Sequence, residues 1–360
     1  MDLSKHRNYA KWTIPRVDLD KMYVYLSAKN MKKITILVPD GQGNLSSIIG
    51  AYKILTRANN FWKEKENREG YQIQLAGLSS EQDFHDGLFS VRPHTHLSAV
   101  KKTDLVIIPS VNHQFREAIE KNAYLIQWLK EQYMLGAEVA SICTGAFLLA
   151  QTGLLSGKSC STHWAFADSF RAMFPQVDVK RDGLITNEHG IYTNGGAYSF
   201  LNLIIYLVER YFDRQTAIFC SKVFQIDIDR QTQAPFIIFA GQKSHDDEIV
   251  KEAQAYIENN LHSRLSIAEL ISNYAVGRRN FDRRFIKATG NTPIEYAQRV
   301  RVEAAKKAFE TSCKNVKEVM YESGYSDMKA FREVFRKITG LSPLEYRSRY
   351  NKETGAESFL

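Results

Sequence analysis

Two stretches of this sequence match at an offset of 50 residues: Arg279-Asn-Phe-Asp-Arg-Arg-Phe-Ile-Lys-Ala-Thr-Gly-Asn-Thr-Pro-Ile-Glu-Tyr296 and Lys329-Ala-Phe-Arg-Glu-Val-Phe-Arg-Lys-Ile-Thr-Gly-Leu-Ser-Pro-Leu-Glu-Tyr346. Both phenylalanines, the Thr-Gly pair, the proline and the final Glu-Tyr coincide in the two copies. Self-similarity at a fixed offset indicates two copies of one structural unit. The C-terminal third therefore contains a duplicated module.

Each copy has the spacing of a helix-turn-helix unit. Short helices are expected over 266–274 and 315–323, and after a tight turn each is followed by a second helix, over 278–289 and 327–339. A continuous helix over 293–311 joins the copies. Its length of about 28 Å is comparable with the ~34 Å repeat of B-DNA, so both second helices can enter successive major-groove segments.

The second helix of the first copy carries a local excess of positive charge. Five basic residues and one acid, Asp282, lie between Gly277 and Gly290. Phenylalanines four residues apart share a face that must be buried, which turns the basic side chains outward. A repeated helical bundle with merely solvated basic faces is the alternative. Two helix-turn-helix units with basic second helices are the more specific signal, and they favour DNA binding.

Residues 246–350 resemble the AraC/XylS-type DNA-binding domain, most closely from Gly324 to Arg347. The resemblance implies double-stranded DNA and RNA polymerase as partners. Two positions depart from the family pattern: Gly277 stands where a capping serine is usual, and Glu333 where an arginine is frequent, which predicts that the second copy reads few bases. The resemblance implies DNA contacts by Arg279, Arg283, Lys329 and Arg332. Further candidates on the same two helices are Arg278, Asn280 and Arg336.

The sequence before this module alternates between apolar, β-rich runs and helical periodicity. Strands are expected at 33–38, 71–77, 104–108 and 138–142, and helices at 45–62, 115–134, 145–151 and 197–211. This alternation indicates a parallel sheet covered on both faces. The fold class is therefore an α/β flavodoxin-like parallel-sheet domain followed by an all-α double helix-turn-helix domain.

Composition and pattern changes predict five segments. The α/β sensing domain occupies 32–212, a linker 213–245 and the DNA-binding domain 246–350. Residues 351–360 form a tail. Residues 1–31 are an N-terminal extension, which is either an upstream extension of the reading frame or a short appended arm.

A cysteine follows the strand expected at 138–142, in the sequence Val139-Ala-Ser-Ile-Cys143-Thr-Gly-Ala-Phe-Leu-Leu-Ala150. A residue between a strand and a helix, followed by small residues, is typical of a nucleophile elbow. Thr162-His163-Trp164 supplies an imidazole that could approach the thiol. With Gly153-Leu-Leu-Ser-Gly-Lys, these motifs make residues 32–212 resemble the PfpI-like branch of the class I glutamine amidotransferase-like superfamily, which is found fused to AraC-type modules.

The resemblance is compatible with two functions for residues 32–212, an enzyme and a sensor. Enzymes of this superfamily commonly place a carboxylate after the first strand, but the only acid of that loop is Asp40, at the strand end. The loop over 109–113 also departs from the Gly-Gly pair that helps to form an oxyanion hole. We therefore expect no enzyme but a pocket for an unknown small-molecule effector. Its candidate residues are Cys143, His163, Thr144, Asp40, Gln42 and His113. The alternatives are a cysteine-dependent amidohydrolase or glyoxalase-like enzyme fused to a DNA-binding module, and a Cys143 that only packs at a tight turn.

Composition and residue spacing exclude several other classes of protein and of binding site. No stretch approaches the apolar run of about 20 residues that a membrane span needs. The four cysteines have no paired spacing, and His85, His94 and His96 are expected to be polar loop residues, so we expect neither a metal nor a cofactor. A net charge of +8 suits a polyanionic partner. The sequence thus predicts a cytoplasmic, DNA-binding transcriptional regulator, and the resemblance to PfpI-like domains, which commonly pair through surface helices, implies a homodimer.

Overall fold

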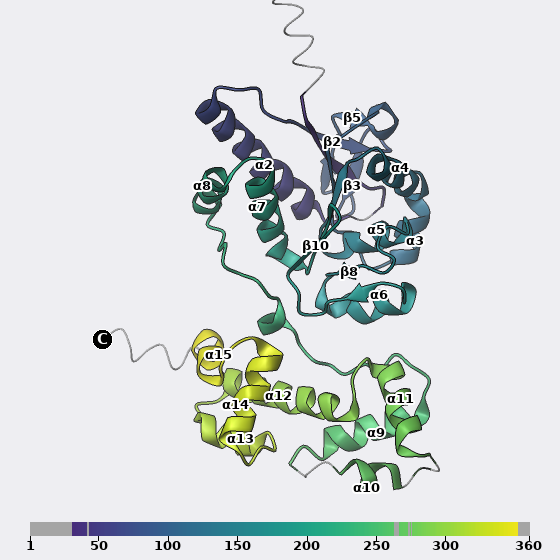
Figure 1. Ribbon diagram of the computed structural model, residues 1–360, viewed down its shortest axis with the longest axis vertical. Helices are drawn as coiled ribbons and strands as arrows, with labels where there is room; N and C mark the ends of the chain where they lie inside the picture. Colours follow the sequence, from purple (N-terminus) through teal and green to yellow (C-terminus); the bar gives the residue numbers. More distant parts are fainter. Residues whose placement is uncertain (1–30, 42, 263–265, 273, 275, 352–360) are drawn as a thin grey trace, which may run out of the picture.

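The computed structural model describes residues 31–41, 43–262, 266–272, 274 and 276–351 (Figure 1). Apart from residues 31 and 351, the expected extension and tail lie outside the described residues. The chain forms an α/β domain and a helical domain, drawn one above the other in Figure 1. The segment boundaries given above remain predictions.

The α/β domain is built on a seven-stranded sheet with the order β10-β11-β7-β6-β1-β2-β5. Neighbouring strands are parallel except β10, which pairs antiparallel with β11. The strands are β1 (Lys33–Val38), β2 (Gln72–Gly77), β5 (Thr95–His96), β6 (Leu105–Ile108), β7 (Glu138–Ser141), β10 (Ile185–Glu188) and β11 (Ile191–Asn194). The four predicted strands correspond to β1, β2, β6 and β7, which are consecutive in the sheet. The predicted parallel α/β sheet is therefore confirmed.

Helices cover both faces of this sheet, and each face has its own apolar core. One layer contains α2 (Leu45–Glu66), α7 (Phe200–Tyr211) and α8 (Arg214–Phe224). The other layer contains α3 (Phe115–Lys121), α4 (Ala123–Met134), α5 (Ala146–Gln151) and α6 (Ala167–Met173). Although α8 lies in the segment expected as a linker, its Ala217 and Cys220 are buried in the core with α2 and α7.

The prediction of one helix over 115–134 is wrong, because Asn122 separates α3 from α4. The Asn122 side chain is fully buried and pairs with the backbone of Asp40 in both directions, accepting from its N–H and donating to its C=O, each at 2.9 Å. This pairing ties the break in the helix to the loop after β1.

Short elements complete the α/β domain. The two-stranded pairs are β3 (Gln82–Phe84) with β4 (Phe89–Val91) and β8 (Ser159–Cys160) with β9 (Asp178–Val179). The 3-10 helices are η1 (Leu97–Ala99), η2 (Cys143–Gly145), η3 (Trp164–Phe166), η4 (Ala197–Ser199) and, in the connection to the helical domain, η5 (Ala234–Phe236). Among the described residues, no helix is both long and apolar enough to cross a membrane.

The helical domain has the predicted double helix-turn-helix order. Its helices are α9 (Glu248–Asn259), α10 (Ile267–Ser272), α11 (Arg278–Thr289), α12 (Pro293–Thr311), α13 (Val316–Glu322), α14 (Met328–Thr339) and α15 (Pro343–Tyr350). The second helices of the two units are α11 and α14, and α12 connects the units. The bounds of α11 and α12 coincide with the predicted ones, and α14 begins one residue later.

Residues shared by the two copies perform the same structural task in each. Thr292 caps α12 and Ser342 caps α15, each accepting a hydrogen bond from the backbone N–H of a glutamate three residues later. That glutamate, Glu295 or Glu345, accepts in return from the N–H of the capping residue. These reciprocal capping boxes satisfy N–H groups that a helix start otherwise leaves unpaired. The repeated Thr/Ser-Pro-x-Glu pattern is therefore a helix-start signal.

The connecting helix α12 takes part in both cores. Near its start, Tyr296 is buried with Phe281 and Phe285 of the first unit. Near its end, Phe309 is buried with Phe335 of the second unit. The two units therefore have separate cores that are joined by one rigid element.

An ion pair between α9 and α11 makes the stability of the helical domain depend on pH. Asp247 caps α9 and accepts two hydrogen bonds from Arg284, at 2.7 and 2.8 Å. These bonds to Arg284 hold the pKa of Asp247 below its usual range. A carboxyl group whose pKa is lowered by folding stabilises the folded state above its unfolded pKa, and this stabilisation is lost as the pH falls through its folded pKa.

We predict that Asp247→Asn lowers the melting temperature at neutral pH, where the asparagine still caps α9 but loses the charge facing Arg284. The difference from wild type should shrink as the pH falls below about 4. Thermal unfolding followed by circular dichroism between pH 7 and pH 3 measures this. Glu248→Gln, at the exposed neighbouring position, is the control. A difference that stays constant over this pH range would contradict the prediction.

Candidate functional site

The basic surface of the helical domain lies on α11 and α14. All seven candidate DNA-contact side chains are exposed. Phe281, Phe285, Phe331 and Phe335 of the same helices are fully buried, as their four-residue spacing predicts. The packing of the phenylalanines thus presents the basic residues to solvent, although their contacts with DNA remain a prediction.

The arginines of α11 differ in their partners. Arg278 forms an ion pair with Asp282 at 2.8 Å, and Arg284 is engaged with Asp247. Arg283 donates to the side-chain oxygen of Asn280 at 3.0 Å, which leaves its charge unneutralised. Within the described part of the chain, Arg279 has no carboxylate at ion-pairing distance. Arg279 and Arg283 are therefore the arginines of this helix that no carboxylate among the described residues neutralises.

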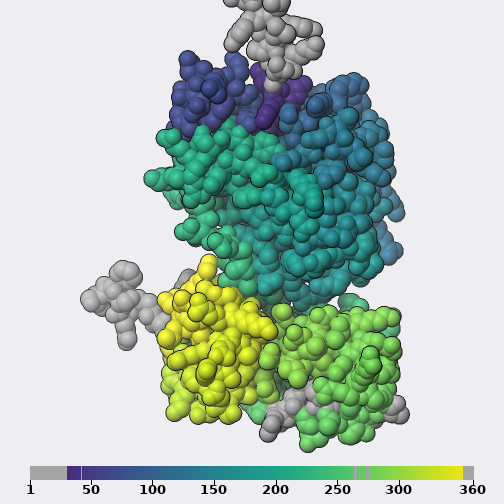
Figure 2. All heavy atoms as spheres, in the orientation of Figure 1, coloured from purple at the N-terminus to yellow at the C-terminus, as the bar shows by residue number. Residues whose placement is uncertain are grey.

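The α/β domain and the connecting segment meet the opposite ends of these helices. Gly290 ends α11 with a φ of 68°, and a side-chain carbon there would lie 3.2 Å from the Arg171 guanidinium. Gly340 ends α14 with a φ of 75°, and a carbon there would lie 3.5 Å from a methyl group of Thr232. A helix of 12 residues is about 18 Å long, so the N-terminal basic residues lie far from this contact. Figure 2 shows the two units as green and yellow lobes side by side below the α/β domain.

The predicted elbow geometry is present at Cys143. This residue follows β7, opens η2 and has a φ of 54°, which is rare for a residue with a side chain. A side chain at Gly145 would lie 2.5 Å from the Pro109 carbonyl oxygen, so only glycine fits there. The Thr162 hydroxyl donates to the Cys143 carbonyl at 2.9 Å. The turn is therefore fixed from both sides.

Thr144 serves the structure of this turn. Its buried hydroxyl lies 2.7 Å from the Ser110 hydroxyl and accepts from the Val111 N–H at 3.1 Å. These bonds join the elbow to the loop over 109–113. The hydroxyl is thus occupied within the protein.

The two predicted pocket histidines, His113 and His163, both lie beside Phe166. The His113 ring lies 4.4 Å from the Phe166 ring, and the His163 ring lies 5.6 Å from the same ring. Burial, and secondarily the nearby His113, lowers the pKa of His163, so this imidazole is mainly uncharged at neutral pH. Nδ1 of His163 accepts from the Ala165 N–H at 3.2 Å and so caps η3.

Asp40 lies in different surroundings. Its carboxylate accepts from the Ser79 hydroxyl at 3.0 Å, and the residue lines a small cavity of about 80 Å³ with Glu117 and Lys121. No hydrogen bond joins Asp40 to Cys143 among the described residues. The predicted candidate Gln42 lies outside the described residues.

Sequence reasoning missed a cavity beside the connecting segment. It has a volume of about 190 Å³ and lies between η4 and η5. Of the expected pocket residues it includes His163. The available signal was the combination of Arg230, two glutamines and Phe236 within 230–236, a segment predicted only as linker. Its lining is formed by His163, Trp164, Gly196, Ala197, Tyr198, Ser199, Arg230, Gln233 and Phe236.

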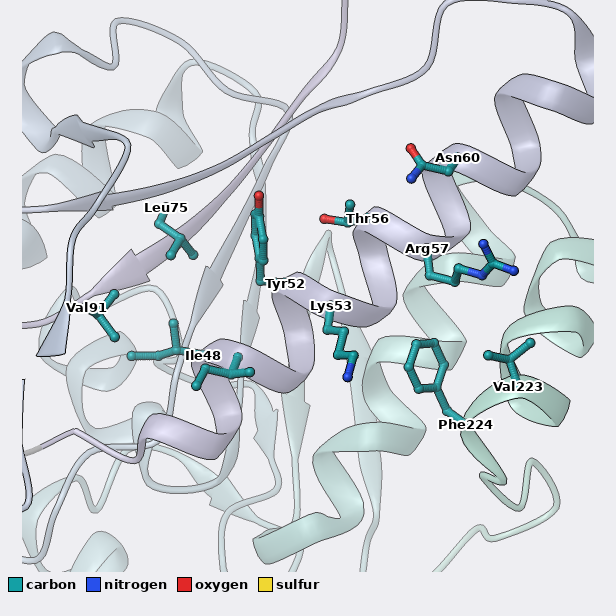
Figure 3. A pocket seen from close by; sticks show the side chains of 11 residues that line it. Ile48, Tyr52, Lys53, Thr56, Arg57, Asn60, Leu75, Val91, Val223 and Phe224 are labelled. Carbon is teal, nitrogen blue, oxygen red and sulfur yellow. The ribbon is translucent and has the colours of Figure 1, made fainter. Parts of the chain in front are cut away.

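A larger, mainly apolar groove of about 520 Å³ lies on the α2–α8 layer (Figure 3). Tyr52, Lys53 and Arg57 reach it from α2, and Val223 and Phe224 reach it from α8. Val91 of β4 and Leu75 of β2 complete one side. No local sequence pattern predicts this groove, because it is formed by helices and strands that are distant along the chain.

The histidines after β2 have local roles, and the prediction that His96 is a loop residue is wrong, because His96 lies in β5 and pairs with Gly77 of β2. Nδ1 of His94 accepts from the Leu75 N–H at 2.9 Å, and Nδ1 of His96 lies 2.8 Å from the Ser98 hydroxyl. Among the described residues, no group of three or more His, Cys, Asp or Glu side chains could hold a metal ion.

Comparison with known protein families gives two matches. Residues 32–197 match the DJ-1/PfpI family, and residues 270–349 match a helix-turn-helix domain family. The chain joins a DJ-1/PfpI domain to an AraC-type helix-turn-helix domain.

Two relatives that each match more than half of the chain are named as transcriptional regulators. The chain is 24% identical over 323 residues to the HTH-type transcriptional regulator GbdR of Pseudomonas aeruginosa, covering 89% of this chain and 85% of GbdR. It is 23% identical over 226 residues to the HTH-type transcriptional regulator GlxA of Rhizobium meliloti, covering 61% and 68%. Among solved structures, Drosophila melanogaster DJ-1beta is similar with a TM-score of 0.46 and 18% identity, covering 55% of this chain and 99% of that structure.

Proposed function

We propose that this protein is a sequence-specific, DNA-binding transcriptional regulator whose DJ-1/PfpI domain binds an effector and pairs two copies of the chain. The observation that carries this proposal is the duplicated helix-turn-helix unit, with exposed basic side chains on both α11 and α14. From the resemblance to AraC-type regulators we also infer that the DNA-bound protein acts through RNA polymerase.

The geometry of the helical domain suits two adjacent major-groove contacts. Helices α11 and α14 present their basic N-terminal halves away from the α/β domain, and α12 holds them apart. Arg279 and Arg283 in the first unit, and Lys329 and Arg332 in the second, are the side chains that we assign to phosphates or base edges. The ion pair of Arg278 with Asp282 makes Arg278 a weaker contributor.

We predict that the full chain binds duplex DNA with an affinity that falls steeply as the salt concentration rises, because neutralised phosphates release counterions. Arg279→Ala should reduce affinity about tenfold or more and lower the salt slope by about one. Asp282→Asn frees Arg278 and should raise affinity. Fluorescence anisotropy at several salt concentrations measures both effects, with Arg214→Ala in α8 as the control. An unchanged affinity in Arg279→Ala would show that α11 does not face DNA.

For the DJ-1/PfpI domain we propose sensing without substrate turnover. A cysteine nucleophile needs a base held by an orienting group and donors aimed at the developing oxyanion. Asp40 is bound to Ser79, and Nδ1 of His163 is used in capping η3. The elbow at Cys143 nevertheless has the backbone of an enzyme site, so a cysteine-dependent amidohydrolase or glyoxalase-like activity is the second candidate.

We predict that Cys143→Ser leaves basal DNA affinity unchanged and that neither protein turns over substrates in amidase, deglycase and glyoxalase assays. A serine keeps the shape of the elbow and removes the thiol, so the comparison isolates the sulfur. DNA anisotropy and the three assays are run on the same preparations. Turnover at ordinary enzymatic rates in wild type that Cys143→Ser abolishes would favour the enzyme.

For dimerisation we propose that the α2–α8 groove receives the same face of a second chain. Ile49 and Val223 on this face are 50% and 46% exposed, and Phe89, on the strand that supplies Val91, is also 50% exposed. A stable interface covers about 800 Å² on each partner and has an apolar centre. The groove provides such a centre and involves no residue of the helical domain, so two paired chains keep their DNA-binding surfaces free.

We predict that the chain is a dimer at micromolar concentration and that the double variant Ile49→Asp, Val223→Asp is a monomer. Both side chains are about half exposed, so the charges should disrupt association without unfolding the domain. Analytical ultracentrifugation measures the mass, and circular dichroism checks the fold. Met134→Asp, at an exposed position on α4 in the opposite helical layer, is the control. A double variant that remains dimeric would place the interface elsewhere.

A further inference from the structure

The cavity between η4 and η5 lies at the junction of the two domains. His163, Trp164 and Tyr198 reach it from the DJ-1/PfpI domain, and Arg230 and Phe236 reach it from the connecting segment. Its volume of about 190 Å³ suits a small organic molecule rather than a macromolecule.

The cavity contains a positive charge without a matching negative one. The Arg230 guanidinium lies 4.3 Å from the centre of the Phe236 ring, and its Nε donates to the Thr232 carbonyl at 3.5 Å. In the described part of the chain, no carboxylate lies at ion-pairing distance from Arg230, and Asp227 acts on it only at longer range. Burial lowers the pKa of Arg230, which reflects the cost of keeping this charge partly out of water.

A second arginine increases this excess charge. Arg349 of α15 lies 5.0 Å from the centre of the same Phe236 ring. Two guanidinium groups thus approach one aromatic ring, one from the connecting segment and one from the DNA-binding domain. Their mutual repulsion is a further reason why the pKa of Arg230 is lowered. An anion bound at Arg230 would neutralise this local charge.

The remaining walls suit an apolar group. Trp164, Phe236 and Tyr198 supply aromatic surface, and Tyr198 is 70% exposed at the mouth of the cavity. Burial lowers the pKa of His163, which disfavours a positive charge on this wall of the cavity. The Gln233 amide group is held by backbone carbonyl groups of the DJ-1/PfpI domain, which fixes the floor.

We propose that this cavity binds a small organic carboxylate, whose carboxylate group pairs with Arg230 and whose apolar part contacts Trp164, Tyr198 and Phe236. Charge-assisted bonds between guanidinium and carboxylate groups are short and directional. The proposal rests on the proposed regulatory function, because it assigns the effector class to a site other than the elbow at Cys143.

Residues beside the cavity also contact the DNA-binding domain, so a bound ligand can influence that domain through these contacts. Directly beside Phe236, Pro235 accepts a hydrogen bond from the Tyr350 hydroxyl at 3.3 Å. Ala234 and Pro235 also lie against Gly340 at the end of α14. A ligand shifts a conformational equilibrium only through contacts that differ between its states. Neutralising Arg230 beside Arg349 changes such a contact.

The test uses the full chain and two probes of nearly equal shape, benzoate and its neutral analogue benzamide. Isothermal titration calorimetry should detect benzoate binding, with benzamide at least about tenfold weaker because it lacks the charge that pairs with Arg230. Arg230→Gln should lower benzoate affinity to the level of benzamide. Arg214→Gln, an exposed arginine of α8 paired with Glu209, should leave it unchanged. Tyr198→Ala should weaken both probes.

Coupling is measured separately by DNA anisotropy on a duplex of mixed sequence. Saturating benzoate should change DNA affinity in wild type but not in Arg230→Gln, and Arg349→Gln should bind benzoate yet lose most of this response. Equal binding of the two probes to wild type, absence of benzoate binding, or unchanged binding in Arg230→Gln would overturn the proposed site. Benzoate binding without any DNA affinity would overturn the proposed function and leave the site standing. Binding without any change in DNA affinity would overturn only the coupling.

Discussion

The side-chain amide of Gln233 fixes the path of the chain between the two domains. Its nitrogen donates to the carbonyl groups of Arg181 at 2.8 Å and Thr162 at 3.1 Å, and it also approaches that of Gly183 at 3.3 Å. The side chain is buried, and Gly195 packs against it so closely that any side chain there would collide with the amide. An amide without these partners would be costly to bury, so the segment has one stable position on the DJ-1/PfpI domain.

The helical domain is oriented by the residues that follow this anchor. Lys306 of α12 donates to the Ile237 carbonyl at 2.6 Å and pairs with Glu303 at 2.7 Å, and only 5% of its side chain is exposed. Glu303 in turn accepts from the Phe239 N–H at 3.1 Å. A buried lysine requires such satisfied partners. Because α12 contributes to both helical cores, holding α12 positions both helix-turn-helix units together.

The sequence was most informative where a local pattern has one physical interpretation. The helices of the duplicated unit were predicted closely because capping boxes, paired phenylalanines and glycine ends are all local signals. Strands β1, β2, β6 and β7 were predicted because buried parallel strands form continuous apolar runs. Strand β10 was missed because Asn187 and Glu188 interrupt its apolar pattern, and β11 was missed because it ends in the polar pair Thr193-Asn194. The break at Asn122 was missed because its cause is a contact with Asp40, 82 residues earlier.

The candidate site shows the same limit. The elbow at Cys143 could be predicted because it depends on consecutive residues. Which side chains share its surroundings could not, because that depends on the packing of separate loops. In the structure His113 and His163 both lie beside Phe166, whereas the Asp40 carboxylate is hydrogen-bonded to Ser79 in the loop after β2. The cavity at Arg230 depends on how η5 returns to the first domain, which no local pattern encodes.

The length of α12 sets a requirement on the DNA. Its 19 residues rise about 28 Å, which is shorter than the ~34 Å between successive major-groove segments on one side of a straight duplex. The helix is packed into two cores and cannot stretch to remove this difference. If α11 and α14 are separated by the length of α12, a duplex that receives both must curve towards the protein, and sequences that bend easily between the two contacts are then preferred even where no side chain touches a base.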